Sequence, residues 1–298
     1  MNQALSYCKL CELADFRHPE LRPLIRDVNG VGEDRPDFPE GEEHRKSWEI
    51  AMTARALRDH GALRDDAEIL GVGAGQESTI FWLTRHVRRV FATDLYLEED
   101  SWSETDSGPG MLVSPAWGAG QEWNPRRLVA QHMDGTRLNY EDDSFDGIFS
   151  SGSIEHFGSL KDIRRSVEEM FRVLKPGGVA AIATEYRIEG PPGLPGTVLF
   201  DEDQLRSVVL DGMKWELASP LDLSIDEETL LTVVEWRSLI KSGEYPTLPT
   251  RLLSALRGQG WDPPEPDVEF VPPPLPHLVI RFDDYIWTSV HLTLIKPS

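Results

Sequence analysis

Three glycines stand at every second position in the run Ile69-Leu70-Gly71-Val72-Gly73-Ala74-Gly75. A glycine-rich turn between a strand and a helix allows a ligand to approach the bare backbone. In an open parallel sheet, that crevice is where ligands bind. The dinucleotide-binding pattern G-x-G-x-x-G is not met, because it would need a glycine at Gln76 or Ser78. No Gly-Lys-Ser/Thr follows either, so the turn does not match a phosphate-binding loop.

Two aspartates end apolar runs that we expect to be neighbouring strands. Asp94 lies about 20 residues after the glycine turn, where a carboxylate can accept hydrogen bonds from both hydroxyls of a ribose. Asp134 ends the next run, where a carboxylate can accept a hydrogen bond from an adenine amino group. Together with the glycine turn, these residues indicate a nucleoside ligand with no requirement for a phosphate.

Candidates for acid–base chemistry follow the fourth expected strand, in the segment Ser150–Gly158. His156 is the first candidate for a general base, because an unperturbed histidine titrates near neutrality. Glu155 is the second candidate. Both side chains can instead cap the following helix or fix the loop. Tyr186, at the end of the fifth expected strand, is a candidate for lining the acceptor side.

The elements that must position these residues alternate between strands and helices. We expect a strand with its turn at 67–75, further strands at 88–96, 127–134, 146–151 and 177–186, and helices at 47–63, 77–87 and 160–174. This alternation implies βαβ units and a parallel sheet with helices on both faces. The candidate residues then face one crevice at the carboxyl ends of the strands.

The last third of the chain is less regular. We expect helices at 201–212 and 227–241, and a stiff proline-rich linker at 262–276. Two β-like runs follow, at 277–282 and 286–296. Their joint, Asp283-Asp284-Tyr285, is so short that it favours an antiparallel pair at one edge of the sheet.

The order of these motifs, with the later run Leu174-Lys175-Pro176-Gly177-Gly178, resembles the class I S-adenosylmethionine-dependent methyltransferases over roughly residues 45–187. The resemblance implies a Rossmann-like, doubly wound α/β fold with a mostly parallel seven-stranded sheet and an antiparallel last strand. It implies S-adenosylmethionine as the cofactor, with the glycine turn at its methionine end. The implied cofactor contacts are Gly71, Gly73, Gly75, Asp94, Leu95, Asp134, Gly135 and Ser151.

The turn departs from the family pattern at two positions. Gly71 stands where an acid is usual, and Glu77 stands where the third glycine is usual. Since that acid helps to hold the ammonium group of the cofactor, our hypothesis is that Glu77 supplies the missing carboxylate. The alternative is that Glu77 only complements a helix dipole. Arg45 is a candidate partner of the cofactor carboxylate, or else part of a solvated helix start.

The resemblance also suggests a domain organisation. Residues 1–46 form an N-terminal arm or cover, and residues 47–298 form the methyltransferase domain. Within that domain, residues 97–125 are a long polar loop, and residues 189–276 are an insertion on the acceptor side.

Three tryptophans of the long loop, Trp102, Trp117 and Trp123, are candidates for closing the site around an acceptor. Packing into a local core is the alternative, which we favour for at least one of them. The reaction that we expect is O-methylation of a small hydroxylated metabolite or sugar, by in-line transfer with a general base. Methylation of carbon or nitrogen, and a non-catalytic protein that binds S-adenosylmethionine, remain as alternatives.

The composition narrows the choice of partners and compartment. The 298 residues carry a net charge of −21, whereas binding to nucleic acid or to an anionic membrane surface needs a basic surface. We therefore expect a small-molecule acceptor, no nucleic acid, no membrane and a cytoplasmic location. Cys8 and Cys11 are the only cysteines, which gives neither a disulfide framework nor a full zinc site, and we expect no metal.

Overall fold

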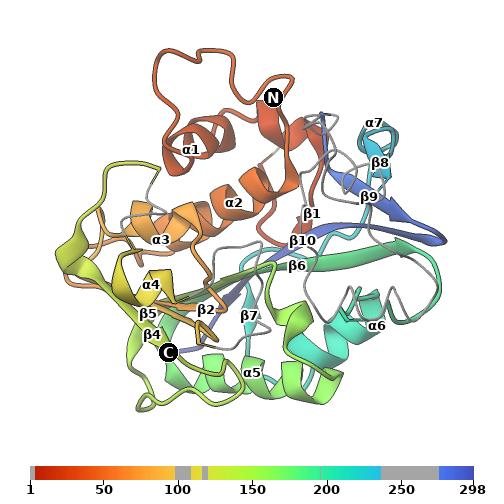
Figure 1. The fold of residues 1–298 in the computed structure, drawn as a ribbon. Helices are drawn as coiled ribbons and strands as arrows, with labels where there is room; N and C mark the ends of the chain where they lie inside the picture. The colour runs from red at the N-terminus through yellow and green to blue at the C-terminus, as the bar shows by residue number, and fades with distance from the viewer. Residues whose placement is uncertain (1–3, 98–108, 116–119, 195, 236–274) are drawn as a thin grey trace.

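The computed structural model describes residues 4–97, 109–115, 120–194, 196–235 and 275–298 (Figure 1). A long sheet crosses the molecule and has helices on both of its faces. On the upper face in Figure 1 lie α1 (Leu21–Val28), α2 (Arg45–Asp59) and α3 (Ser78–Leu83). On the lower face lie α5 (Leu160–Val173) and α6 (Glu202–Leu205).

The strand order in the sheet is β4-β3-β2-β5-β6-β10-β9-β8. The first five are mutually parallel: β4 (Leu128–His132), β3 (Arg89–Asp94), β2 (Glu68–Val72), β5 (Phe145–Ser151) and β6 (Leu174–Glu189). The last strand, β10 (Tyr285–Ile295), is antiparallel to β6 on one side and to β9 (Val279–Phe282) on the other. The doubly wound, mostly parallel sheet with an antiparallel last strand is thus confirmed.

Three strands come in addition to the seven that we expected. β8 (Val233–Glu235) pairs with β9 in parallel, and the short strands β1 (Lys9–Leu10) and β7 (Glu216–Leu217) pair with β10. Because β1 lies in the N-terminal arm, this arm is joined to the sheet by backbone hydrogen bonds.

Each face of the sheet has its own apolar core. Ile163, Val167 and Met170 of α5 recur at helical spacing and are buried against the lower face. On the upper face, α2 is buried along almost its whole length, with alanines such as Ala54 and Ala56 in close contact with the sheet. Glu49 of α2, at the carboxyl end of the strands, therefore has little access to solvent, whereas Lys46 in the first turn is partly exposed.

The first turn of α2 is fixed by two histidines. The Nδ1 atom of His44 accepts a hydrogen bond of 3.1 Å from the amide of Lys46 and so caps the helix. The backbone of His44 also forms a bridge with His277, whose carbonyl accepts a 3.0 Å hydrogen bond from the amide of Arg45. The helix consequently begins at Arg45, two residues before the start that we expected at residue 47.

The helix expected at residues 227–241 is confirmed only at its start, α7 (Glu227–Leu230). It is wrong at residues 233–235, which form strand β8. The β-branched residues Thr232, Val233 and Val234 favour an extended backbone, which pairing with β9 then stabilises. Residues 236–241 lie outside the described part of the chain.

In its described residues, the loop expected at residues 97–125 includes the helical segment α4 (Gly110–Val113), and the turn η3 (Pro125–Arg127) begins at its last residue. Trp102 and Trp117 lie outside the described residues. In the parts of the chain that the structure describes, no helix combines the length and the apolar character that crossing a bilayer requires.

Candidate functional site

The glycine turn follows β2 and bends sharply between its neighbours. Gly73 and Gly75 have φ values of 63° and 50°, in the left-handed region that favours glycine. A Cβ atom on Gly73 would lie 2.7 Å from the Cβ of Ser153, and one on Gly71 would lie 2.6 Å from the Cζ of Phe149. These close approaches require glycine at both positions.

Asp94, at the end of β3, is held against this turn. Its Oδ2 accepts a 2.8 Å hydrogen bond from the amide of Gly75, and its Oδ1 accepts one of 2.6 Å from the amide of Leu95. Tyr96 donates its hydroxyl to the carbonyl of Gly75 at 2.8 Å. Burial raises the pKa of the Asp94 carboxyl above its usual value. The carboxylate is therefore oriented before any ligand arrives.

Asp134 and Gly135 follow β4 at the same edge of the sheet. The side chain of Asp134 is exposed, and its Oδ1 accepts a 2.8 Å hydrogen bond from the amide of Thr136. The ring of Phe157 lies close to two of the predicted glycines, since a Cβ atom on Gly135 or on Gly73 would lie 2.8 Å from it. Phe157 thus connects the two ends of the predicted nucleoside site, and our reading of the sequence did not identify it.

Lys46, in the first turn of α2, reaches the glycine turn. Its Nζ lies 2.7 Å from Glu49, donates to the carbonyl of Ser151 at 3.1 Å and lies 3.4 Å from Glu77 Oε1. Burial raises the pKa of Glu77 to about 7, against the opposing charge of Lys46. The Oε2 atom of Glu77 is buried without a hydrogen-bond partner among the described residues.

Arg45 directly precedes Lys46 in α2, but its side chain faces β6 and β10. Its Nη1 lies 2.7 Å from Glu185 at the end of β6, 3.1 Å from Glu49 and 3.1 Å from the hydroxyl of Ser289 on β10. The cation beside the glycine turn is thus Lys46, which we had not singled out. A sequence signal existed, since Lys46 and Glu49 have the i,i+3 spacing of a helical ion pair.

Glu155 lies in η4 (Ile154–His156), a single turn directly after β5. Its Oε2 accepts a 2.7 Å hydrogen bond from Thr184. Its Oε1 is buried 3.8 Å from Nε2 of His156 and has no hydrogen-bond partner within the ranges that the structure describes. Burial, reinforced by the charge of Glu185, raises the pKa of Glu155 to about 8.

His156 has the opposite shift. Burial, together with the positive charges of Lys46 and Arg45, lowers the pKa of its imidazole to about 3. The ring is therefore neutral and only weakly basic. A general base is most effective when its pKa is close to the working pH, so these shifts favour Glu155 over His156, the reverse of the order that the sequence suggested.

A single point beside Gly152, at the end of β5, has three of these charged groups around it. A Cβ atom built on Gly152 would lie 2.6 Å from Lys46 Nζ, 3.4 Å from Glu49 Oε2 and 3.7 Å from Glu155 Oε1. The groups from α2 and η4 therefore converge at the carboxyl end of β5, next to the glycine turn of β2.

A family model described as a methyltransferase domain matches residues 70–182, from β2 into β6. Residues 70–182 are thus a methyltransferase domain, which agrees with the resemblance to the class I S-adenosylmethionine-dependent methyltransferases. The chain is a methyltransferase enzyme, and S-adenosylmethionine is its cofactor.

Solved structures of low sequence identity are similar to this methyltransferase in fold. A putative sarcosine dimethylglycine methyltransferase from Galdieria sulphuraria is 16% identical, with 85% of each chain covered and a TM-score of 0.50. The YcgJ protein from Bacillus subtilis is 17% identical, with 84% of this chain and 99% of that chain covered and a TM-score of 0.49. Phosphoethanolamine N-methyltransferase 2 from Haemonchus contortus is 18% identical, with coverage of 83% and 52% and a TM-score of 0.46.

The remaining predicted residues of the methyltransferase lie further from these groups. Trp123 packs edge-on against Phe81 of α3, with ring centroids 5.3 Å apart, and belongs to the upper core. Tyr186 is half-buried, packs against the lower core and forms a backbone bridge with Phe200. Cys8 and Cys11 are buried free thiols. Among the described residues, no group of three or more His, Cys, Asp or Glu side chains could hold a metal ion.

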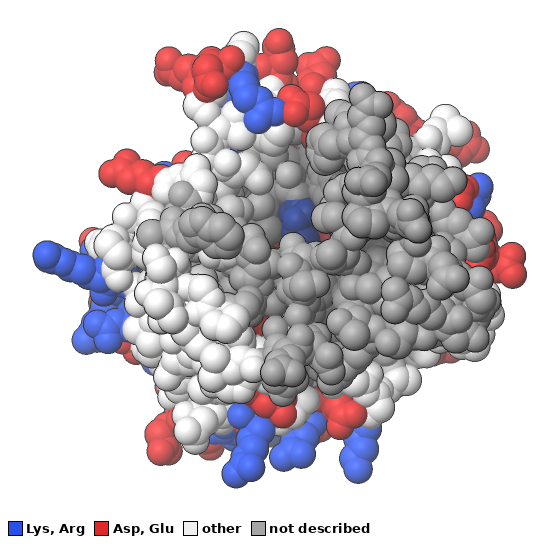
Figure 2. Space-filling model, in the orientation of Figure 1, with Lys and Arg blue, Asp and Glu red and all other residues white. Residues whose placement is uncertain are grey.

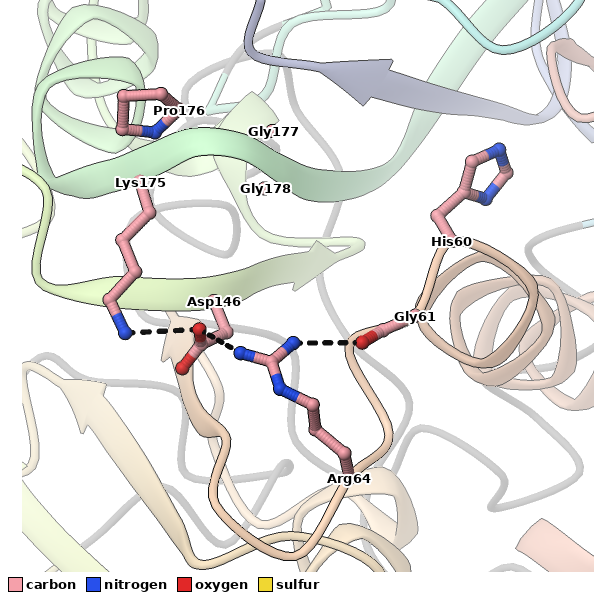
Figure 3. Close-up of a pocket in the computed structure, with 8 residues that line it drawn as sticks. All are labelled: His60, Gly61, Arg64, Asp146, Lys175, Pro176, Gly177 and Gly178. Atoms are coloured by element: carbon pink, nitrogen blue, oxygen red, sulfur yellow. Dashed lines mark hydrogen bonds and ion pairs between the residues drawn. The ribbon is translucent and has the colours of Figure 1, made fainter. Parts of the chain in front are cut away.

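A polar hollow of about 120 Å³ lies near the start of β5, at the opposite end of the strands (Figure 3). Arg64 and Lys175 both point to the carboxylate of Asp146, with Lys175 at 3.0 Å (Figure 3). Asp146 also accepts a hydrogen bond from the amide of Glu68. These partners account for the charges in the hollow, which is distinct from the crevice at the carboxyl ends.

Charge is distributed unevenly over the surface. Figure 2 shows acidic side chains gathered at the top of the molecule and a mixture of acidic and basic side chains along the bottom. It also shows a basic side chain at the base of a hollow near the centre of this face, away from the other charged groups. The positive charge visible there is recessed below the surrounding surface.

Proposed function

We propose that this methyltransferase methylates a hydroxyl oxygen of a small hydroxylated metabolite or sugar, with Glu155 as the general base. The observation that carries the proposal is the buried Oε1 of Glu155, which lies beside Gly152 and has no hydrogen-bond partner in the described part of the chain. When bound, S-adenosylmethionine supplies a methyl group that is already activated on a positively charged sulfur. The protein's own tasks are to orient the acceptor and to remove a proton from it.

The groups at the crevice fit the cofactor. Glu77 Oε2 is a buried acceptor that no described residue contacts by a hydrogen bond, which suits an ammonium group. The nearby ammonium of Lys46 suits a carboxylate. Asp94, with Leu95, is oriented to accept the ribose hydroxyls. Asp134 and Gly135 take the adenine in this proposal, and Ser151 contributes its carbonyl through Lys46. In this proposal Arg45 does not contact the cofactor itself but holds Glu49 and Glu185 in place.

The acid–base step follows from the geometry at η4. Oε1 of Glu155 takes the hydroxyl proton of the acceptor, while Thr184 keeps Oε2 in place. His156 is a positioning residue, with its Nε2 3.8 Å from Oε1. Its low pKa keeps the ring neutral, so it does not compete for the proton.

The expected domain organisation is part of the proposal. Residues 1–46 cover the cofactor side, in keeping with the pairing of β1 with β10 and the capping of α2 by His44. Residues 189–276 shape the acceptor side, which the 2.9 Å hydrogen bond from Val198 to the carbonyl of Glu155 supports. A cytoplasmic enzyme of small-molecule biosynthesis, acting on neither nucleic acid nor membrane, completes the proposal and agrees with the net charge of −21.

The test begins with calorimetric titration of S-adenosylmethionine, S-adenosylhomocysteine and, as a control, NAD. Binding of the two sulfur compounds and not of NAD is the expected result. Acceptors that contain hydroxyl groups are then screened with isotopically labelled cofactor, and mass spectrometry locates the methyl group in the product. Methyl transfer to oxygen that is lost in Glu155→Gln supports the proposal, and transfer to nitrogen or carbon contradicts it.

A further inference from the structure

Two buried carboxylates on the β6 side of the site each have an oxygen atom without a hydrogen-bond partner among the described residues. These atoms are Oε1 of Glu155, whose side chain is 1% exposed, and Oε2 of Glu185, whose side chain is 10% exposed. Their other oxygens are already engaged, with Thr184 and with Arg45. Burying a carboxylate oxygen without a donor costs free energy, so the two bare atoms are suited to a donor from a ligand.

The order of the strands separates these atoms from the expected place of the cofactor. Glu77 follows the glycine turn of β2, Glu155 follows β5, and Glu185 lies near the end of β6. Since β2, β5 and β6 are consecutive in the sheet, Glu155 and Glu185 lie towards β6, away from the glycine turn. A donor for them therefore comes from the acceptor rather than from the cofactor.

Among the described residues, the site has fewer cations than carboxyl groups. Arg45 is shared between Glu49 and Glu185, and Lys46 is shared between Glu49 and Glu77. His156 adds no positive charge, because its lowered pKa keeps it neutral. Among the described residues, no cation lies within hydrogen-bond distance of Glu155. When Glu155 is ionised, as the removal of a proton from the acceptor requires, the described residues set two cations against four carboxyl groups, and positive charge is in deficit.

We propose that the acceptor carries a protonated amine that binds at Glu155 and Glu185, next to the hydroxyl group that is methylated. The acceptor class is then an amino alcohol or an amino sugar. This inference rests on the proposed function, because it assigns the β6 side of the site to the acceptor. Only a group that is both a hydrogen-bond donor and a cation satisfies the two bare oxygens and the charge deficit together.

Binding of such an amine also prepares the base. In the free protein, the raised pKa of about 8 leaves Glu155 largely protonated at neutral pH. An ammonium group beside it favours the ionised form, so the carboxyl group releases its proton to solvent on binding. A neutral acceptor of the same shape leaves the proton in place. Release of a proton is therefore a signature of an amine at this site, and it is measurable without turnover.

The experiment is a calorimetric titration of the protein saturated with S-adenosylhomocysteine. Ethanolamine and ethylene glycol serve as a matched pair of probes, because they differ in one amino group. Each titration is run at pH 7 in two buffers of different ionisation enthalpy, which counts the protons released. We expect ethanolamine to bind at least about tenfold more tightly than the glycol, with release of roughly 0.9 proton, the fraction that a group of pKa 8 carries at pH 7.

Substitutions at the two glutamates test which of them is responsible for the proton release and for the preference for the amine. Glu155→Gln should abolish the proton release, and Glu185→Gln should remove most of the preference for the amine. Glu168→Gln, on the exposed side of α5, is the matched control and should change neither quantity. Thermal unfolding of each variant is recorded alongside. The comparison of the two probes on the unmodified protein stands even if a variant does not fold.

Two results would overturn the inference. One is equal binding of the two probes, including no binding of either, and the other is tighter binding of the amine without proton release. The proposed function has a separate readout, the position of the methyl group in the product. A preference for amines with the methyl on nitrogen would uphold the ammonium site and contradict O-methylation. Transfer to oxygen without a preference for amines would do the reverse.

Discussion

The amide of Gly75 donates a 2.8 Å hydrogen bond to Oδ2 of Asp94, so the glycine turn and the proposed ribose ligand form one unit. A change at Asp94 therefore removes a ligand contact and also frees the turn. We expect Asp94→Ala to weaken binding of S-adenosylmethionine by about 10- to 100-fold, the value of one or two hydrogen bonds to a charged group. Calorimetric titration measures the loss, and an unchanged affinity would contradict the assignment.

Glu77 makes cofactor binding dependent on pH. Its pKa of about 7 means that half of the free protein carries the ionised carboxylate at neutrality. If this form holds the ammonium group, the affinity falls as the pH drops below 7, by up to tenfold per unit, and levels off above it. Glu77→Gln should bind more weakly and lose this pH dependence. A variant that binds as tightly as the wild type at every pH would exclude the role.

The rate of catalysis should also depend on pH, through the ionisation of the Glu155 carboxyl group. Because the pKa of Glu155 is raised to about 8, about a tenth of the free enzyme has the ionised base at pH 7. We expect kcat/KM for the acceptor to rise with pH up to about 8 and then level off. Glu155→Gln should lower kcat by about 10²- to 10⁴-fold. His156→Gln should have a smaller effect and leave the position of the pH profile unchanged, whereas loss of the profile in that variant would return the role of base to His156.

Arg45 should matter more for stability than an exposed arginine. Arg45→Met leaves Glu185 buried without its cation and Glu49 with Lys46 alone, and removing one partner of a buried ion pair costs about 3–5 kcal/mol. Arg206→Met is the matched control, since its pair with Glu202 is exposed and contributes less than about 1 kcal/mol. Urea denaturation compares the free energies of unfolding. Equal losses of unfolding free energy in the two variants would show that the ion pairs of Arg45 contribute no more than an exposed pair.

Gly73 and Gly61 offer a matched pair for the glycine turn. Both have a left-handed backbone, with φ values of 63° and 75°, so an alanine is strained at either position. Only at Gly73 does the added Cβ meet another side chain, at 2.7 Å from Ser153, whereas at Gly61 it meets nothing within 4 Å. We expect Gly61→Ala to cost about 1–2 kcal/mol of stability. Gly73→Ala should cost more and also abolish cofactor binding, which Gly61→Ala retains.

The order of the motifs sufficed to predict the sheet and the crevice. The glycine turn, Asp94 and Asp134 come after consecutive parallel strands, and such strands bring their carboxyl ends to one edge. The short joint at Asp283–Tyr285 likewise predicted the antiparallel pair of β9 and β10. These features depend on local patterns and on connection lengths, both of which are visible in a sequence.

The choice between Arg45 and Lys46 was not visible in the sequence. Successive residues of a helix point about 100° apart, so the first residue of α2 decides which cation faces the glycine turn. That start is set by His44 and His277, which are far apart in the sequence. The order of Glu155 and His156 was likewise hidden, because burial shifts their pKa values in opposite directions. Strand β8 was missed because its pairing with β9 overrides the helical pattern around Leu230.

The contact between the two histidines has a consequence for how the enzyme matures. The carbonyl of His277 fixes the first turn of α2, and Ser289 of β10 binds both Arg45 and Glu49. During synthesis, β2 to β6 leave the ribosome well before these C-terminal partners do. The first turn of α2 and the side chain of Arg45 therefore gain these contacts only after residues 277–289 have been made and have folded back onto the helix. The folding of the cofactor side thus depends on a segment that is synthesised more than 100 residues after the glycine turn and β5.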